Sequence, residues 1–341
     1  SMEGTLYDAN GKKIKSLKKS EIKDLSAVDG ISLMDDNRIK VHGFFHRVYP
    51  YTVEYETVVQ YDCTYFFPLW DPVDNEKIAV IQSAITVVAP VDFPVRYKAF
   101  NYTKEPEITT EKGNKIYRWE IKSFEPIELE YAYPAWDYLV PMVYLAPAKF
   151  EIEKYRGDMS TWQGLGKFIY TLNQGRDKLP ENIKEVVHQI ADTITDTKEK
   201  IAKLYNYMQQ NTRYISIQLG IGGLQPFDAT YVAERKYGDC KALSNYMYSL
   251  LKEAGIKSHY TLVKAGEGKN YFRDDFPSDQ FNHIILCVPL QKDTVWLECT
   301  SQTAPAGYLS GFTSNRPVLL IDEDGGKLVK TPQYGMTQNT Q

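Results

Sequence analysis

The chain has few of the features that mark membrane-spanning or nucleic-acid-binding proteins. No apolar stretch approaches the roughly 20 residues that a membrane helix needs, so we predict no transmembrane segment. The formal net charge is only −4 over 341 residues. The one basic run, from Lys12 to Lys19, is short and interrupted and is interpreted as a solvated hairpin, so we expect no nucleic-acid partner.

Cysteine is also scarce. The four thiols are Cys63, Cys240, Cys287 and Cys299, which are widely spaced and include no C-x-x-C pair. This spacing fits neither a disulfide framework nor a zinc ribbon. A zinc site built from Cys287, Cys299 and His283 would match no standard spacing. We therefore predict no metal and no cofactor, and cysteine usage leaves the redox compartment open.

What is present is typical of a globular protein. Hydrophobic residues make up 43% of the chain and charged residues 25%. The length favours two domains rather than one. Aromatic residues are more numerous than usual, with 26 Tyr and five Trp. They favour a Tyr-rich β-domain, and the alternative is a peptide- or glycan-binding surface.

Residues 1–155 have the pattern of β-structure. Turn signals at Asn10-Gly11 and at Lys112-Gly113 predict two hairpins. Apolar and aromatic residues occupy every second position from Val53 to Tyr65, which predicts one long half-buried strand. Because no convincing helical period is found, we predict an antiparallel β-sandwich domain.

A connecting segment, residues 156–182, leads to a region with a different period. From Ile183 apolar residues recur at helical spacing, and one predicted helix runs from about Cys240 to its end at Gly255. Strands are predicted afterwards, the last of them over residues 295–300. Helices followed by strands indicate a second domain, residues 183–341, of the α+β class.

The most informative motif surrounds Cys240. Gly238 permits a tight turn, and Asp239 is a good N-cap residue. Cys240 then occupies the first helical position, where free N–H groups and the helix dipole favour a thiolate. The nearby charge of Asp239 opposes that thiolate, so we expect a histidine partner. The alternative is a small buried cysteine that packs at the start of a helix.

His283 and Glu298 are the candidate partners. They lie on two segments that should pair as a hairpin, and a register with His283 opposite Glu298 or Thr300 brings the imidazole to the carboxylate. In this arrangement His283 exchanges protons with Cys240 and Glu298 orients the ring. The backbone N–H of Cys240 would form an oxyanion hole with a second donor, for which Gln218 and Tyr214 are equal candidates. The other histidines have no such company and are interpreted as structural: His42, His46, His188 and His259.

These motifs resemble the transglutaminase-like superfamily over roughly residues 183–320. The resemblance rests on the motif Tyr237-Gly238-Asp239-Cys240-Lys241, on Asn282-His283 and on residues 296–300. It implies a papain-like fold with a Cys, His and acid triad. The superfamily usually has Asp as the acid, where this chain has Glu298.

The first 155 residues resemble the β-domain of unknown function that precedes such domains in bacterial envelope proteins. Residues 18–24 and 49–56 carry this match. It implies a periplasmic or secreted location, and a further C-terminal β-domain in the full-length protein. We predict a cysteine peptidase or amidase that acts on a peptide or protein. The alternatives are a transglutaminase-type acyl transferase and an inactive peptide- or glycan-binding protein.

Overall fold

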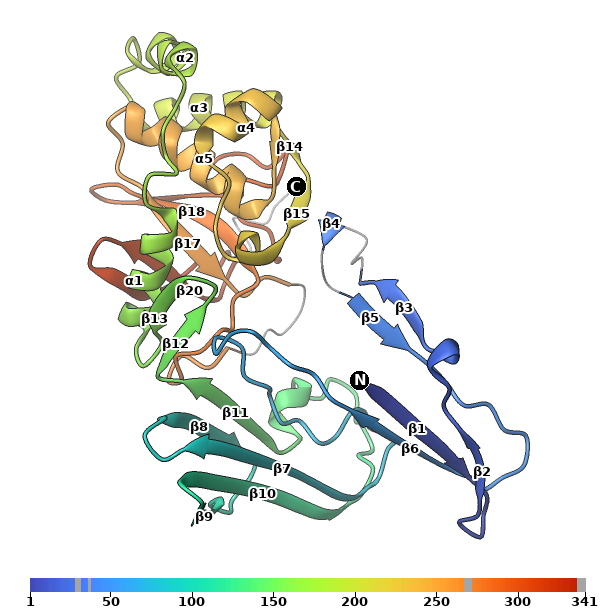
Figure 1. Cartoon of the computed structure of the whole chain (residues 1–341). Coiled ribbons are helices and arrows are strands. Elements are labelled where there is room, and N and C mark those ends of the chain that lie inside the picture. Colours follow the sequence, from blue (N-terminus) through green and yellow to red (C-terminus); the bar gives the residue numbers. More distant parts are fainter. Residues whose placement is uncertain (28–31, 36–37, 267–271, 336–341) are drawn as a thin grey trace. The chain divides into compact units, whose positions relative to one another are not determined.

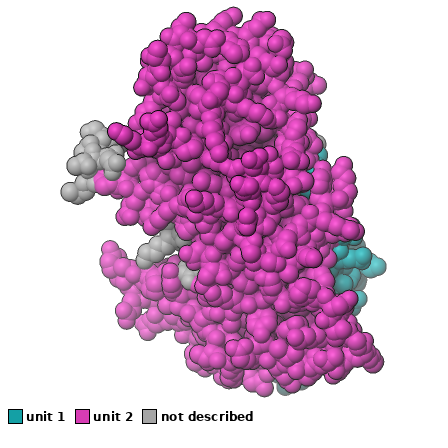
Figure 2. Space-filling view, turned by 90° about the vertical axis from the view of Figure 1, so that its left-hand side faces the viewer, with its two compact units in different colours: residues 1–62, 215–223 teal, residues 63–214, 224–341 magenta. Residues whose placement is uncertain are grey.

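The computed structural model describes residues 1–27, 32–35, 38–266 and 272–335 of a mixed α/β protein with a β-rich N-terminal region (Figure 1). The predicted fold class is confirmed. Contacts divide the chain into two compact units (Figure 2). Unit 1 comprises Ser1–Asp62 and Ile215–Gly223, and unit 2 comprises Cys63–Tyr214 and Leu224–Gln341. Among the described residues, no helix is both long and apolar enough to cross a membrane.

The described residues of unit 1 form short strands and two 3-10 turns. Its sheets have the orders β2-β1-β6 and β3-β5, and the parallel pair β4-β15 joins its two chain segments. The predicted hairpin at Asn10-Gly11 connects β1 to β2. The elements of this unit are β1 (Met2–Tyr7), β2 (Lys13–Ser16), η1 (Lys19–Glu21), β3 (Lys23–Ser26), β4 (Ser32–Asp35), β5 (Arg38–Val41), β6 (Thr52–Thr57), β15 (Ser216–Gln218) and η3 (Gly220–Gly223).

The prediction of one long strand from Val53 to Tyr65 is wrong. The strand β6 ends at Thr57, and its side chains are exposed on both faces. Further along the chain, the amide of Thr64 donates to the carbonyl of Glu151, and the ring of Tyr65 packs on Phe150. The alternating pattern therefore spans a strand of one unit and a segment of the other in which only Tyr65 is buried.

The strands of unit 2 that precede α1 (Trp162–Asn173) include two small sheets that share one core, and a separate pair, β12-β13. Trp119 of the β7-β10-β9 sheet and Leu145 of the β11-β8 sheet belong to the same buried cluster, as the predicted sandwich requires. Lys112 and Gly113, with φ of 49° and 80°, make the predicted turn between β9 and β10. These elements are β7 (Val80–Pro90), β8 (Val95–Phe100), β9 (Glu107–Glu111), β10 (Asn114–Phe124), η2 (Trp136–Tyr138), β11 (Met142–Pro147), β12 (Lys149–Ile152) and β13 (Tyr155–Asp158).

The rest of unit 2 combines helices with a five-stranded antiparallel sheet of order β19-β18-β17-β20-β21. One face of the sheet packs on α5 and its neighbouring helices, and a second buried cluster covers the other face. The elements are α1 (Trp162–Asn173), α2 (Glu181–Ala191), α3 (Thr197–Asn211), β14 (Arg213–Tyr214), α4 (Ala229–Arg235), β16 (Tyr237–Gly238), α5 (Cys240–Glu253), β17 (His259–Val263), β18 (His283–Pro289), β19 (Thr294–Leu297), β20 (Pro317–Asp322) and β21 (Gly325–Lys330).

The helix α1 lies in the segment predicted as a connection, and it packs tightly on β20 and β21. A Cβ atom added to Gly166 would come within 2.2 Å of Gly326 Cα, so the two backbones touch. Only glycine allows this approach. The domain boundaries at residues 155 and 183 stay predictions.

Candidate active site

Cys240 is the first residue of α5, as predicted, and it is 6% exposed. The carboxylate of Asp239 caps the helix by accepting a 2.9 Å hydrogen bond from the amide of Ala242. A Cβ atom on Gly238 would lie 2.7 Å from Ala242 Cβ, so the turn before the thiol needs glycine. The local sequence therefore places the thiol at the N-terminus of a 14-residue helix, where an anion is favoured.

Asp239 is buried together with Lys241, and the two form an ion pair that the sequence did not lead us to expect. Their side chains are 2% and 6% exposed. The lysine charge offsets the carboxylate charge that would otherwise oppose a thiolate at Cys240. A lysine in the first turn of an otherwise apolar helix start was the available signal, since charged side chains are rarely buried without a partner.

His283 is hydrogen-bonded to both other members of the predicted triad. Its Nε2 lies 3.0 Å from Oε1 and 3.2 Å from Oε2 of Glu298, and both residues are 9% exposed. The same imidazole has a side-chain hydrogen bond with Cys240. Because Nε2 faces the carboxylate, Nδ1 is the ring nitrogen left for the thiol. The structure thus brings Cys240, His283 and Glu298 together.

The electrostatics of this cluster favour a charged imidazole. Burial opposes the charge on His283, but hydrogen bonds and charge interactions with Cys240 and Glu298 outweigh it and raise its pKa to about 10. Burial likewise opposes the Glu298 carboxylate. Its bonds to His283 and Thr300 outweigh burial and lower the pKa of Glu298. A charged imidazole held by a carboxylate is the partner that a thiolate nucleophile needs.

The backbone around Glu298 explains how its longer side chain reaches the ring. The predicted strand over residues 295–300 ends at Leu297, which pairs with Leu286. Glu298 therefore follows the strand end, and its carbonyl accepts a 2.7 Å hydrogen bond from the hydroxyl of Tyr205. The hydroxyl of Thr300 donates to Glu298 Oε1 over 2.6 Å. Thr300 was predicted only as a possible register partner of His283, and its positioning contact with Glu298 was not foreseen.

A loop after β19 packs its Phe312 ring edge-on against His283, at 5.4 Å and 66°. The buried guanidinium of Arg316 holds this loop by donating to the carbonyls of Ser314 and Gly311, and it also donates to Lys264. Sequence analysis gave no indication of either residue, because their roles arise from tertiary contact alone.

The two candidates for the second oxyanion donor lie in different units. Tyr214 pairs through its backbone with Gly238, two residues before the thiol, and is half-buried. Gln218 belongs to unit 1, where its amide donates to Ser216 Oγ over 3.1 Å. The choice between them stays a prediction.

The remaining cysteines of the second domain lie apart from one another. Cys287 belongs to the cluster on one face of the sheet, and Cys299 to the cluster beneath α5. Burial raises the pKa of both thiols, to about 12 for Cys287. Within the described ranges, no group of three or more His, Cys, Asp or Glu side chains is arranged to hold a metal.

Comparison with known families divides the chain into two matched regions. Residues 184–303 match the transglutaminase-like superfamily, and residues 1–128 match a domain of unknown function with solved structure, DUF3857. No curated protein matches the chain. The predicted resemblance is confirmed in both regions and in their order.

The chain is also similar to several solved structures. A proposed protease from Parabacteroides distasonis ATCC 8503 aligns with a TM-score of 0.65 and 13% identity over 97% of this chain. This chain spans 61% of that protein, and identity at this level indicates the fold alone. A proposed cysteine protease from Cytophaga hutchinsonii gives a TM-score of 0.32 at 14% identity, over 71% of this chain and 74% of that one. A structure described as a TGase gives a TM-score of 0.27 at 13% identity, over 62% of this chain and 46% of that one.

Proposed function

Because residues 184–303 form a transglutaminase-like domain, we propose that this chain is a thiol-dependent hydrolase that cleaves an amide or isopeptide bond. The observation that supports this function is the hydrogen-bonded series of Cys240, His283 and Glu298 at the N-terminus of α5. A structural cysteine would need neither a buried imidazole nor a carboxylate beside it.

The proposed reaction has two steps. In the first, the Cys240 thiolate attacks the substrate carbonyl carbon, and a C–S bond forms. The His283 imidazolium then gives its proton to the leaving amine nitrogen as the C–N bond breaks. In the second, neutral His283 takes a proton from water, whose oxygen attacks the thioester. The acid leaves, and the thiolate and imidazolium are restored.

The supporting groups have separate tasks. Glu298 keeps the ring oriented and stabilises its charge, and Thr300 keeps the carboxylate in place. The backbone N–H of Cys240 would donate to the developing oxyanion, with Tyr214 or Gln218 as the second donor. An amine that replaces water in the second step would give acyl transfer through the same intermediate.

Thiol reactivity tests whether the site is active. We would measure iodoacetamide alkylation of each cysteine against pH by peptide mass spectrometry, in wild type and in His283→Ala. Cys240 should react rapidly near pH 7, and in the variant only at the pH of an ordinary thiol, about 8.5. Buried Cys287 and Cys299 serve as internal controls. A Cys240 that is inert and indifferent to His283 would overturn the proposed enzyme activity.

Turnover then separates hydrolysis from transfer. Wild type and Cys240→Ala would be incubated with a mixed peptide library, with and without a primary amine. New peptide termini that require Cys240 support the hydrolase. Amine adducts on glutamine without cleavage would instead establish an acyl transferase. Absence of any Cys240-dependent product, together with an unreactive thiol, would favour the peptide- or glycan-binding alternative.

We also propose that the protein acts in the periplasm or after secretion, and that the full-length protein carries a further C-terminal β-domain. Both proposals rest on the resemblance of the N-terminal region to β-domains of bacterial envelope proteins, and the match of residues 1–128 to DUF3857 supports that resemblance. Fractionation of source cells with an antibody against the chain tests the first proposal. Recovery only with cytosolic markers would overturn it.

A further inference from the structure

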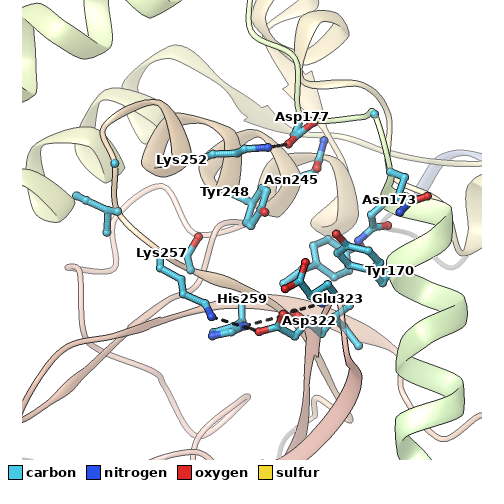
Figure 3. A pocket seen from close by; sticks show the side chains of 17 residues that line it. Tyr170, Asn173, Asp177, Asn245, Tyr248, Lys252, Lys257, His259, Asp322 and Glu323 are labelled. Atoms are coloured by element: carbon cyan, nitrogen blue, oxygen red, sulfur yellow. Dashed lines mark hydrogen bonds and ion pairs between the residues drawn. The ribbon is translucent and has the colours of Figure 1, made fainter.

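Unit 2 contains a pocket of about 530 Å³ whose lining includes none of the three triad residues (Figure 3). Residues of α1, of the C-terminal half of α5, of β17 and of the turn after β20 line it. Lys252 in this lining pairs with Asp177, and Lys257 pairs with Asp322. A group bound here would touch none of the triad residues. The residues that select the reacting part of a substrate must therefore lie around the triad itself.

Phe312 is an aromatic residue beside the triad whose ring is still accessible. The ring packs edge-on against the imidazole of His283, with 5.4 Å between the centroids, and the side chain is 41% exposed. Leu309 and Thr313 on the same loop are fully buried. Single exposed apolar side chains are common on protein surfaces, but this one contacts the group that transfers the proton. Its exposed part is apolar surface next to the reacting groups.

The loop that carries Phe312 is held on both sides of the ring. The guanidinium of Arg316 donates to the carbonyls of Gly311 and Ser314, over 2.5 Å and 3.0 Å. The carbonyl of Phe312 itself accepts a 3.0 Å hydrogen bond from the amide of Gly266. These contacts fix the backbone and leave the ring free to meet a ligand. A substrate group that packs on it therefore need not order the loop first.

The position of Phe312 beside His283 decides which part of a substrate it meets. In the proposed reaction the imidazolium gives its proton to the leaving nitrogen, which must come within roughly 2.6–3.2 Å of the ring nitrogen. The first carbon of the leaving group lies only about 1.5 Å beyond that nitrogen. Substituents on this carbon therefore lie on the imidazole side of the reacting bond, where Phe312 is. The acyl part of the substrate is bonded to the sulfur of Cys240 instead.

The chemistry of the ring decides which kind of substituent fits. Phenylalanine has no donor or acceptor, so a polar side chain placed against it would lose hydrogen bonds to water without replacement. An apolar side chain removes both surfaces from water, which is favourable. An aromatic side chain adds the ring-to-ring contact.

We propose that Phe312 is a specificity-determining residue that selects an apolar or aromatic side chain on the amine side of the scissile bond. This inference rests on the proposed function and deepens it, because it assigns the leaving group of the same reaction. An amine that attacks the thioester takes the reverse path and occupies the same place. Phe312 should therefore select an attacking amine through the same contact.

Trapping the acyl-enzyme with competing amines tests this selection without a known substrate. The Cys240 thiolate attacks the carbonyl carbon of 4-nitrophenyl acetate, a thioester forms, and nitrophenolate leaves. An amine then attacks the thioester, neutral His283 takes its proton, and the thiolate leaves as the amide forms. Phenylalaninamide, leucinamide and serinamide would be present in equal excess, and their N-acetylated products measured by mass spectrometry. Cys240→Ala supplies the background rate of each product.

After this correction, wild type should form the phenylalanine product at least about fivefold faster than the serine product. Phe312→Ala should reduce this preference to about twofold or less. Phe312→Leu keeps an apolar side chain, in case the alanine variant does not fold, and should shift the preference toward leucinamide. Tyr308→Ala is the matched control and should keep the full preference. Tyr308 lies on the same loop and is also 41% exposed, but it stacks on Tyr334.

The possible failures can be told apart. A wild type that shows no amine preference or forms no amine product would overturn the inference, as would an unchanged preference in both Phe312 variants. An equal loss of all three products in both variants would also overturn it, because the ring would then only shield His283. In each of these cases the nitrophenolate burst of wild type still establishes a working thiolate. Absence of a burst above that of Cys240→Ala would instead overturn the proposed function, and this inference with it.

Discussion

At the residue scale, the charge of Asp239 determines what the start of α5 offers to a thiolate. Its carboxylate is needed as the N-cap, because it satisfies the amide of Ala242. Lys241 lies on the same turn and pairs with that carboxylate in a nearly dry environment. The helix thereby keeps its cap without placing an uncompensated negative charge beside Cys240.

We therefore predict that Lys241→Met lowers the free energy of unfolding by about 3–5 kcal/mol, because it leaves a buried carboxylate unpaired. Urea denaturation measures this change. The variant should also alkylate Cys240 more slowly at neutral pH. The matched control is the double variant Asp239→Asn with Lys241→Met, which removes both charges and keeps a capping oxygen. If the double variant is no more stable than the single one, the ion pair is not the cause.

Glu298 provides the second residue-scale prediction. Glu298→Gln should lower the pKa of His283 from about 10, because the amide no longer stabilises the imidazolium. Because the pKa of His283 is higher in the folded than in the unfolded protein, the charged imidazole stabilises the folded state. This stabilisation is complete below about pH 6.5 and is lost as the pH rises toward 10. The stability difference between wild type and variant should therefore shrink toward pH 10.

Titration of the His283 Cε1 proton by NMR measures this pKa directly, and denaturation at pH 6.5 and pH 10 measures the stability difference. Turnover, once a substrate is known, should fall by about 100-fold in Glu298→Gln. Glu298→Asp keeps the charge and should be intermediate, since its shorter side chain must reach the same ring. An unchanged His283 titration in Glu298→Gln would contradict the assigned role.

At the element scale, features fixed by local chemistry were predictable and features fixed by distant partners were not. The start of α5 follows from Gly238, Asp239 and an apolar helical period, and the structure has it at the expected residue. The segment from Val53 to Tyr65 also had the right period, but its strand ends at Thr57, and only Tyr65 at its far end packs on a residue of another strand, Phe150 of β12. Alternation alone cannot show where pairing stops.

The same distinction applies to the candidate site. Cys240, His283 and Glu298 were predictable because each residue type has a chemical role in a recognisable motif. Lys241, Tyr205 and Phe312 act through contacts whose partners are distant in sequence or hidden by burial. Among these residues only Lys241 carried a signal, as a lysine in an otherwise apolar helix start, and the identities of Tyr205 and Phe312 carried none.

The contact between α1 and β21 makes an element-scale prediction. Gly166→Ala should lower the free energy of unfolding by about 3 kcal/mol or more, because the new Cβ would meet the backbone of Gly326, which cannot rotate away. Hydrogen exchange should increase first in α1 and β21. Gly311→Ala is the matched control, since nothing lies within 4 Å of its added Cβ. Equal losses in the two variants would argue against a specific clash.

At the scale of the whole molecule, the β-strands of unit 2 support the segment that leads into His283. Arg96 on β8 donates to the carbonyls of Met159 and Pro277, over 2.6 Å and 2.9 Å. Its guanidinium also lies over the ring of Phe276, 4.9 Å from the centroid. Residues 272–282, which directly precede His283, are thus held from the β-rich side of the unit.

We predict that Arg96→Ala increases amide exchange in residues 272–282 and lowers the neutral-pH alkylation rate of Cys240 by several-fold. The physical reason is that His283 begins its strand where this segment ends, so a looser segment spends less time with the imidazole at the thiol. Arg96→Lys keeps a charge but fewer directed donors, and it should be intermediate. Arg118→Ala, which removes a partly exposed arginine of β10 that pairs with Glu120, is the control and should change neither quantity. Faster amide exchange in residues 272–282 without slower alkylation of Cys240 would show that the β-strands do not affect the site and that Arg96 has a purely structural role.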